Sequence, residues 1–415
     1  MVRLRRARIL IVDDSAVMRS LLRSVLDTDS RLETAGTALD GAAALRAVEN
    51  LRPDLVLLDV EMPGMDGLST LKQMRACAMR VPVIMCSSLT QRGARVTIEA
   101  LASGAADYVA KPSGQPSRDA AIQALARELV PKILALTGPR LVPATVPSAH
   151  LPGGVIAAGP AIRQPGRPPL LDGVRPAGLP SVGFLQPIPA PPSGPASPHG
   201  IAAVVIGVST GGPAALDVIL PRLPADFPVP VLIVQHMPEL FTRMLAERLD
   251  GHCPMRVCEA VSGEPIRAGT IYIAKGDWHM EVISMTRGSY AGPAPAHAST
   301  PMALRLQREA PENHCRPAAD VLFRSAAAVY DSALLAVVLT GMGSDGLAGC
   351  RLIRQHNGTV LVQDEATSAV WGMPAAVAHA GLAHKVLALP LIASEILRLV
   401  GRGQREASEL RESVV

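Results

Sequence analysis

The chain has 415 residues, which is too long for one ordinary hydrophobic core and indicates two or three domains. Apolar residues make up 48% of the sequence, aromatic residues only 2%, and the formal net charge is +4. So few aromatic side chains leave little for stacking on nucleic-acid bases, and so small and dispersed a charge gives no reason to expect nucleic acid or a membrane surface as partner.

Cysteine usage and the N-terminus indicate a cytoplasmic protein with reduced thiols. The six cysteines are scattered and none forms a CxxC pair, which argues against a disulfide framework or a zinc site. The basic N-terminus leads into an apolar run that stops at Asp13, whereas a signal peptide needs about seven to fifteen apolar residues. No apolar stretch approaches the roughly 18 residues that span a bilayer, so we expect no direct membrane insertion.

The first segment, residues 1–137, alternates short apolar runs with helical patterns. Strands are predicted over residues 9–12, 55–58, 81–86 and 108–109. After the first of them, the apolar residues between positions 17 and 26 recur at helical spacing. Strands that alternate with helices are typical of a doubly wound parallel sheet of the α/β class.

A stretch rich in proline and glycine separates the two halves of the chain. Residues 138–199 show no hydrophobic period, and structureless loops beyond about 15 residues are uncommon inside a compact domain, so we predict a linker there. Apolar runs return at 202–208, 229–234 and 334–339, each followed by a polar or glycine-rich turn. They predict a second α/β domain over residues 200–402, followed by a polar tail at 403–415.

Polar side chains follow all four predicted strands of the first segment. They are Asp13, Asp14, Asp59, Ser87, Ser88 and Lys111. Because sites in open parallel sheets lie outside the carboxyl ends of the strands, we expect these groups to converge. Carboxylates gathered in this way repel unless a hard cation such as Mg²⁺ joins them. A carboxylate beside such a cation and a lysine can attack a phosphoryl group, whereas a helix-capping role accounts for any one aspartate but not for all of them together.

The first segment resembles the response-regulator receiver family. The resemblance rests on VDDSAVMR, LLDVEMPGMDG, MCSSLT and ADYVAKP, and covers about the first 125 residues. It implies a receiver domain in which Asp59 accepts the phosphoryl group and Ser87 and Lys111 respond to it. It also implies that Asp13, Asp14 and Asp59 bind Mg²⁺ together with the backbone carbonyl of Glu61.

Three polar residues follow the three apolar runs of the second domain. Ser209 lies in the turn GVSTGG, His236 in IVQHMP and Asp345 in VVLTGMGSDG. A glycine turn around a serine also occurs in phosphate-binding loops, so this turn alone is weak support for catalysis. Together the three residues can form a Ser-His-Asp triad, and the glycine-rich loop before Asp345 can offer N–H donors to an oxyanion.

The order of the residues along the chain favours His236 as the base. Ordinary α/β-hydrolases run Ser, Asp, His, which here would require His356, His379 or His384. None of these follows a clear buried strand end, whereas His236 does. Asp320 lies in a helical pattern and is interpreted as a pocket or structural residue.

The second domain resembles the chemotaxis protein-glutamate methylesterase family. The shared motifs are VVIGVSTGGPAAL, VLIVQHMP, RPAADVLF, LTGMGSDG and QDEATSAVWGMP, within about residues 201–400. The resemblance implies Ser209 as nucleophile, His236 as base and Asp345 as its partner. It also implies that the Met342 N–H helps to form the oxyanion hole and that Thr210 lines the site. The chain departs from the family pattern at residues 317–319 and in its long proline-rich linker.

These resemblances together imply a phosphorylation-activated esterase that needs no cofactor for hydrolysis. Its expected substrates are γ-methyl esters of glutamate, and glutamine amides, on the cytoplasmic helices of methyl-accepting chemoreceptors. A chemotaxis histidine kinase is the expected phosphodonor, and phosphorylation of Asp59 is expected to uncover the Ser209 site. The alternatives are a receiver-controlled lipase-type hydrolase and a non-enzymatic adaptor. A transcription regulator is disfavoured because the second half offers no basic helix-turn-helix.

Overall fold

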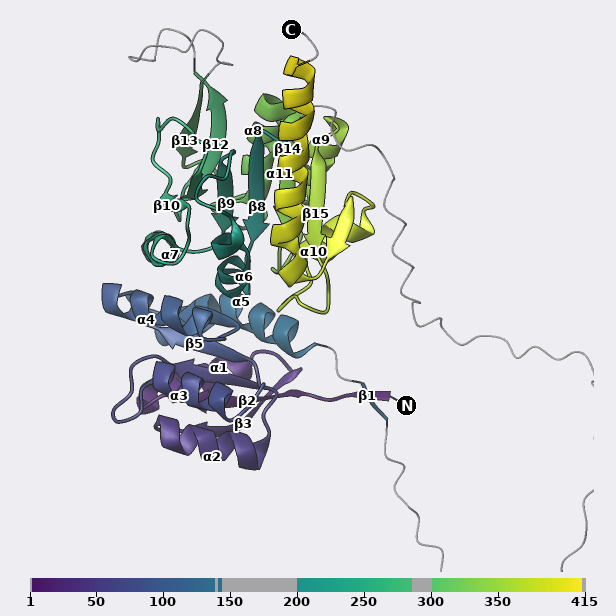
Figure 1. Cartoon of the computed structure of the whole chain (residues 1–415). Coiled ribbons are helices and arrows are strands. Elements are labelled where there is room, and N and C mark those ends of the chain that lie inside the picture. The colour runs from purple at the N-terminus through teal and green to yellow at the C-terminus, as the bar shows by residue number, and fades with distance from the viewer. Residues whose placement is uncertain (1, 139–140, 144–199, 286–300, 413–415) are drawn as a thin grey trace, which may run out of the picture.

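The structure of the protein is a computed structural model. It contains two α/β units (Figure 1). The structure describes residues 2–138, 141–143, 200–285 and 301–412. Most of the predicted linker therefore lies outside the described residues. The predicted start of the polar tail, residue 403, falls within the last helix, α11 (Leu389–Glu412), and residues 413–415 lie outside the described part.

The N-terminal unit is a five-stranded parallel sheet with the strand order β3-β2-β4-β5-β6. Its strands are β2 (Ala7–Val12), β3 (Leu32–Ala38), β4 (Leu55–Asp59), β5 (Val83–Ser87) and β6 (Asp107–Ala110). Its helices are α1 (Ala16–Leu26), α2 (Gly41–Leu51), α3 (Gly67–Ala76), α4 (Gln91–Ala102) and α5 (Arg118–Thr137). A short antiparallel pair, β1 (Val2–Leu4) and β7 (Leu141–Pro143), joins the two ends of this unit.

Local sequence explains why these five helices begin where they do. Each follows a residue whose side-chain oxygen accepts a hydrogen bond from a backbone N–H of the first turn, which satisfies one of the donors that a helix start leaves free. The capping residues are Ser15, Asp40, Asp66, Thr90 and Ser117. The four predicted strands correspond to β2, β4, β5 and β6. Strand β3 was missed because only its first and last residues are buried, so its apolar pattern is weak.

The C-terminal unit is a seven-stranded parallel sheet with the order β10-β11-β9-β8-β14-β15-β16. Its strands are β8 (Ala203–Val208), β9 (Val231–Gln235), β10 (Arg256–Glu259), β11 (Thr270–Ile273), β14 (Leu334–Val338), β15 (Thr359–Gln363) and β16 (Lys385–Leu387). Its helices besides α11 are α6 (Gly212–Ile219), α7 (Glu239–Asp250), α8 (Ala319–Tyr330), α9 (Leu347–Gln355) and α10 (Met373–His379), with 3₁₀ turns η1 (Leu220–Arg222) and η2 (Asp331–Ala333). An antiparallel hairpin, β12 (His279–Ser284) and β13 (Met302–Gln307), was not predicted.

Both sheets reverse their winding direction next to their first long strand. In the N-terminal sheet β2 lies between β3 and β4, and in the C-terminal sheet β8 lies between β9 and β14. The loops that leave the carboxyl ends of strands diverge at such a point and open a crevice, which is where α/β proteins bind ligands. Asp13, Asp14 and Asp59 lie at the ends of β2 and β4 at the first of these points, and Ser209, His236 and Asp345 follow β8, β9 and β14 at the second, whereas Ser87 and Lys111 come from the ends of β5 and β6 further along the same edge. The α/β class and the doubly wound parallel sheets are therefore confirmed.

The two units pack against each other through α4, β6 and α5 on one side and α6 and α7 on the other (Figure 1). The ring of Tyr108 from β6 stacks on the ring of Phe241 from α7, with centroids 4.4 Å apart. Buried apolar residues of both units, among them Leu101 and Met244, belong to one continuous hydrophobic cluster. Within the described residues, no helix has both the length and the apolar character that a membrane span requires.

Candidate functional site

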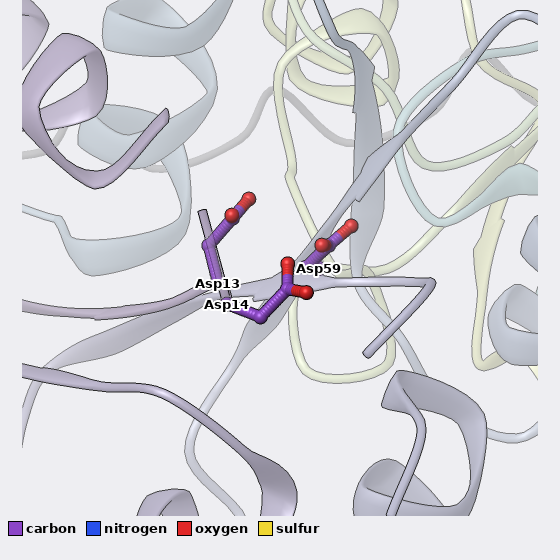
Figure 2. A group of neighbouring side chains, drawn as sticks. All are labelled: Asp13, Asp14 and Asp59. Atoms are coloured by element: carbon purple, nitrogen blue, oxygen red, sulfur yellow. The ribbon is translucent and has the colours of Figure 1, made fainter. Parts of the chain in front are cut away.

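Three carboxylates meet at the carboxyl edge of the N-terminal sheet (Figure 2). Asp13 and Asp14 directly follow β2, and Asp59 is the last residue of β4. One oxygen from each carboxylate lies within 4.8 Å of the others. Lys111 Nζ lies 2.9 Å from Asp13 Oδ2 and 2.7 Å from Asp59 Oδ1. The predicted acidic residues and lysine are therefore brought together.

The negative charge of these three carboxylates exceeds the positive charge of the lysine that pairs with two of them. Three carboxylates face a single ammonium, and Asp13 and Asp59 are buried, so their mutual repulsion is poorly screened. Burial raises the pKa of the Asp59 carboxyl, and the ion pair with Lys111 offsets this only in part. The all-oxygen donor set fits a hard divalent cation. The backbone N–H of Glu61 lies 3.4 Å from Asp59 Oδ1, and the role predicted for its carbonyl stays a prediction.

Ser87 is buried at the end of β5, and its hydroxyl is bonded away from the carboxylates. Ser87 Oγ donates to the carbonyl of Ser88 at 3.1 Å and lies 2.7 Å from Thr97 Oγ1 on α4. The sequence did not point to Thr97, because nothing in its helical pattern distinguishes it from a core residue. This contact links the edge of the sheet to α4, which lies at the boundary with the C-terminal unit.

The second set of polar residues converges at the carboxyl edge of the C-terminal sheet. Ser209 follows β8, His236 follows β9 and Asp345 lies in the loop after β14. His236 Nε2 lies 2.7 Å from Asp345 Oδ2, which leaves Nδ1 as the free ring nitrogen. Ser209 and His236 line one cavity of about 800 Å³. Among the described hydrogen bonds none joins the Ser209 hydroxyl to His236.

Two glycines allow the nucleophile turn to form. Gly211 has φ +80°, in the left-handed region that residues with a Cβ rarely adopt. Gly341 lies beneath Ser209, and a Cβ added there would come 2.7 Å from Ser209 Cβ. The Ser209 N–H donates to the Thr340 carbonyl at 3.0 Å, which ties the turn to the loop after β14. These glycines allow the two loops to approach each other closely.

The buried carboxylate of Asp345 accepts five hydrogen bonds. Oδ2 accepts from His236 Nε2 and from the Ala319 N–H at 2.6 Å. Oδ1 accepts from the N–H groups of Asp320 and Gly346 and from Asn313 Nδ2. Burial would raise the pKa of Asp345, but these bonds, led by that from His236, hold it below its usual value. The carboxylate therefore stays ionised and can orient the imidazole.

His236 has a second neighbour on its free side, the thiol of Cys315. Cys315 Sγ lies 3.6 Å from His236 Nδ1. Burial disfavours the imidazolium, yet the contacts with Asp345 and Cys315 outweigh it and raise the pKa of His236 to about 9. No sequence pattern pointed to Cys315, because it lies on a loop far from His236 along the chain.

Comparison with known proteins identifies the family. Residues 204–396 match the model of the CheB methylesterase family, and residues 9–123 match that of the response regulator receiver domain. A protein-glutamate methylesterase/protein-glutamine glutaminase from Nocardioides sp. is 45% identical over 395 residues, covering 95% of this chain and 96% of the relative. The chain belongs to the CheB methylesterase family. A relative of the same name from Trichodesmium erythraeum is 41% identical over 95% of this chain and 99% of its own. The solved catalytic domain of Thermotoga maritima CheB methylesterase is 40% identical over 48% of this chain and 99% of its own, with a TM-score of 0.44.

Two residues near Ser209 offer backbone N–H groups at the cavity. Met342 and Thr210 both line the cavity, and within the described residues their backbone N–H groups have no hydrogen-bond acceptor. Free N–H groups next to a nucleophile can bind an oxyanion. The Thr210 hydroxyl has a different partner, since it donates to Asp107 Oδ2 in β6 at 2.6 Å.

The receiver unit forms one wall of the catalytic cavity. Asp107, Tyr108 and Lys132 line it opposite Ser209 and His236. Lys132 Nζ donates to the Tyr108 carbonyl at 2.6 Å and lies 3.4 Å from Asp107 Oδ1. A hydrogen bond from the residue next to Ser209 therefore ends on a receiver strand, which joins the two units at this cavity.

Sequence reasoning also missed the surroundings of Asp345. Asp320 was interpreted as a pocket or structural residue, and it lies buried in the first turn of α8. Asn313 was not singled out at all, because a lone asparagine in a polar loop carries no pattern. Its hydrogen bonds to both Asp320 and Asp345 appear only in the tertiary structure.

Proposed function

We propose that this chain is a phosphorylation-activated protein-glutamate methylesterase. It hydrolyses γ-methyl esters of glutamate, and deamidates glutamine, on the cytoplasmic helices of methyl-accepting chemoreceptors. It works in the cytoplasm and takes its phosphoryl group from a chemotaxis histidine kinase. The observation that carries the proposal is the His236–Asp345 pair beside the glycine turn of Ser209, in a cavity with a receiver wall.

Hydrolysis follows from the placement of the three residues. Ser209 Oγ attacks the ester carbonyl while its proton passes to His236 Nδ1, the nitrogen not engaged by Asp345. The N–H of Met342 stabilises the oxyanion that forms on the carbonyl oxygen. The C–O bond to the methoxy group then breaks, and His236 returns the proton so that methanol leaves. Water activated by His236 attacks the acyl-enzyme and releases the glutamate carboxylate and Ser209.

The chemistry at the receiver site is phosphoryl transfer to Asp59. Asp13, Asp14 and Asp59, with the carbonyl of Glu61, would hold Mg²⁺, which when bound supplies positive charge against the charge of the phosphoryl group. Lys111 pairs with Asp59 before transfer and is placed to pair with the phosphoryl oxygens afterwards. Ser87 then exchanges its bond to the Ser88 carbonyl for one to the phosphoryl group.

Regulation is by occlusion, with domains at residues 1–137 and 200–402 joined by a linker at 138–199. Tyr108 stacks on Phe241, and Asp107 accepts a hydrogen bond from Thr210 next to the nucleophile, so the receiver covers the catalytic cavity. A tethered domain meets its partner at high effective concentration, so a modest interface suffices to keep the cavity covered. A phosphoryl group that draws Ser87 away from α4 shifts this equilibrium toward the open state.

The decisive experiment measures methanol release from methylated chemoreceptor by the purified chain, with and without acetyl phosphate and Mg²⁺. We expect slow release that acetyl phosphate accelerates, and loss of several powers of ten in Ser209→Ala. Hydrolysis of small lipid esters without release from the receptor would favour a lipase-type hydrolase. Equal rates in Ser209→Ala and the unaltered chain would leave only an adaptor role.

A further inference from the structure

The side chain of Asn313 lies between two buried carboxylates. Its Nδ2 atom is 2.9 Å from Asp345 Oδ1 and 2.9 Å from Asp320 Oδ2. A primary amide carries two hydrogens on this nitrogen, so each carboxylate receives one and neither hydrogen is left over. Asp320 and Asp345 are only 3% and 2% exposed, whereas Asn313 is itself an exposed loop residue whose amide reaches both of them.

The carboxylate of Asp320 lies where it can orient the Asn313 amide. Its Oδ1 accepts from the Gly349 N–H at 2.6 Å, which fixes the carboxylate on the side of α9, and its Oδ2 faces Asn313. Burial raises the pKa of Asp320, and the nearby charge of Asp345 adds to this effect. An amide whose NH₂ group faces both carboxylates lowers their repulsion, whereas the flipped amide would present its oxygen to them.

The backbone at this position suits asparagine. Asn313 has φ +53°, in the left-handed region where asparagine is among the few non-glycine residues found routinely. One residue earlier, Glu312 pairs with Arg324 at 2.7 and 2.6 Å, and this pair does not contact the Asn313 amide. Asparagine at position 313 itself satisfies both the backbone and the polar requirement.

We propose that Asn313 and Asp320 are positioning residues of the esterase, which extend the triad into a chain of contacts from Asp320 through Asn313 and Asp345 to His236. Asp320 fixes the direction of the Asn313 amide, the amide fixes Asp345 Oδ1, and Asp345 Oδ2 holds the imidazole with Nδ1 toward the cavity. The proposal rests on the proposed function, since it assigns these residues to the same hydrolysis. Asp320 does not line the cavity of Ser209 and His236, whereas Asn313 does, and its positioning role is assigned through its bonds to the two carboxylates.

Two substitutions at Asn313 separate positioning from a purely structural role. Asn313→Gly keeps the left-handed backbone without strain and removes the amide, and we expect kcat to fall about 10- to 100-fold with little change in KM. Asn313→Asp keeps the shape but places a third carboxylate beside the other two. A carboxyl in that position has a raised pKa and can donate only when protonated, so its rate relative to the unaltered chain rises as pH falls.

A matched control and a second variant complete the test. Glu312→Gln weakens the pair with Arg324 in the same loop without touching the amide, and it is expected to keep kcat within about twofold. Asp320→Asn is expected to lower kcat, and combined with Asn313→Gly to lower it by less than the product of the two single effects, because both act through Asp345. The downfield proton resonance of the His236–Asp345 hydrogen bond should shift in Asn313→Gly and not in Glu312→Gln.

The outcomes distinguish this inference from the proposed function. If the unaltered chain releases methanol and Asn313→Gly matches it in kcat and in the His236 resonance, positioning by Asn313 is wrong. A rate ratio for Asn313→Asp that stays constant with pH also overturns it. If the unaltered chain releases no methanol from methylated receptor, the proposed function fails instead, and the His236 resonance still tests whether Asn313 positions Asp345.

Discussion

At the scale of single residues, the imidazole of His236 decides how the site can work. One ring nitrogen is held by Asp345 and the other faces the thiol of Cys315, so in the proposed hydrolysis Nδ1 is the nitrogen that would accept the proton of Ser209. In triads of the chymotrypsin type Nδ1 faces the aspartate and Nε2 is the base, which is the reverse assignment. The base is available only when this nitrogen is unprotonated.

The pH dependence of hydrolysis should follow from the raised pKa of His236. Because the contacts with Asp345 and Cys315 raise it to about 9, most of the imidazole is protonated at neutral pH and kcat/KM should rise from pH 7 toward pH 9. Cys315→Ala removes one of the two raising contacts, so the midpoint should move to lower pH. A pH–rate profile of both enzymes tests this, and a midpoint that stays in place or moves upward would show that the thiol does not bear on the base.

Asp345 and Asp320 should differ in how much they contribute to the rate. Asp345→Asn removes the charge that orients the imidazole, and in a triad such a change costs up to about 10⁴ in turnover. Asp320→Asn acts only through Asn313 and should cost far less. Methanol release from both variants under identical conditions provides the comparison. An inactive Asp320→Asn beside a fully active Asp345→Asn would mean that the acid is assigned to the wrong residue.

At the scale of elements, the turns after β8 and β14 determine where the nucleophile stands. Gly341 leaves no room for a side chain, because an added Cβ would lie 2.7 Å from Ser209 Cβ and 2.5 Å from Met373 Sδ. Such contacts are shorter than real Cβ atoms show, so the two loops must separate. Ser209 would then move away from the position that the proposed attack requires.

Gly341→Ala should therefore lower activity while the sheets stay folded. We expect kcat to fall at least about 100-fold, since a displacement of about 1 Å in an aligned site costs that much. Gly401→Ala is the control, because a Cβ there meets no neighbouring atom. Circular dichroism and methanol release measured on both variants test the expectation. Normal activity in Gly341→Ala would mean that the Ser209 turn does not require a residue without a Cβ at position 341.

We expect phosphorylation at the receiver edge to depend on a divalent cation. One carboxylate oxygen from each of Asp13, Asp14 and Asp59 lies within 4.8 Å of the others. Lys111 carries one positive charge, so it alone cannot cancel the repulsion between these carboxylates and an incoming phosphodonor. Incubation with acetyl phosphate should add one phosphoryl group to the intact mass only when Mg²⁺ is present. In Asp59→Asn the adduct should be absent, and an adduct that persists there would refute the choice of acceptor.

At the scale of the whole molecule, we expect the interface between the receiver and the catalytic unit to set the resting activity. Its central contacts are the stack of Tyr108 on Phe241 and the hydrogen bond from Thr210 to Asp107. Aromatic pairs contribute about 0.5–1.5 kcal/mol beyond their buried area, and a shift of that size changes a closed-to-open ratio by roughly two- to twelvefold. Small changes at this interface should therefore be visible in the rate.

Tyr108→Leu should raise the rate of the unphosphorylated enzyme and lower its activation by acetyl phosphate. Leucine keeps apolar contact but loses the stack, so the open state gains relative to the closed one. The upper limit is the rate of a fragment that begins at Ile201, which should be active without a phosphodonor. If that fragment is no faster than the unphosphorylated full-length chain, occlusion is wrong and the receiver acts positively.

The residues that follow buried strands were predictable from the sequence alone. Ser209, His236, Asp345, Asp59 and Lys111 each come at the end of an apolar run or just beyond it, and the geometry of parallel sheets brings such ends to one edge. Local signals were enough, because the hydrophobic period marks the strand and glycine marks the turn. The α/β class, the doubly wound sheets and the two sets of converging residues follow from these signals.

Only the tertiary structure determined which loop residues lie beside these groups. Asn313 and Cys315 belong to one loop, yet they contact Asp345 and His236, which follow two different strands. Residues within elements behave alike: Thr97 of α4 contacts Ser87, and Asp107 of β6 contacts Thr210 in the other unit. A loop lacks the regular repeat that ties side-chain direction to sequence position, and the repeat of a helix or strand does not reveal which distant residue a side chain contacts. Their partners depend on how distant segments pack, and that packing is a property of the whole fold.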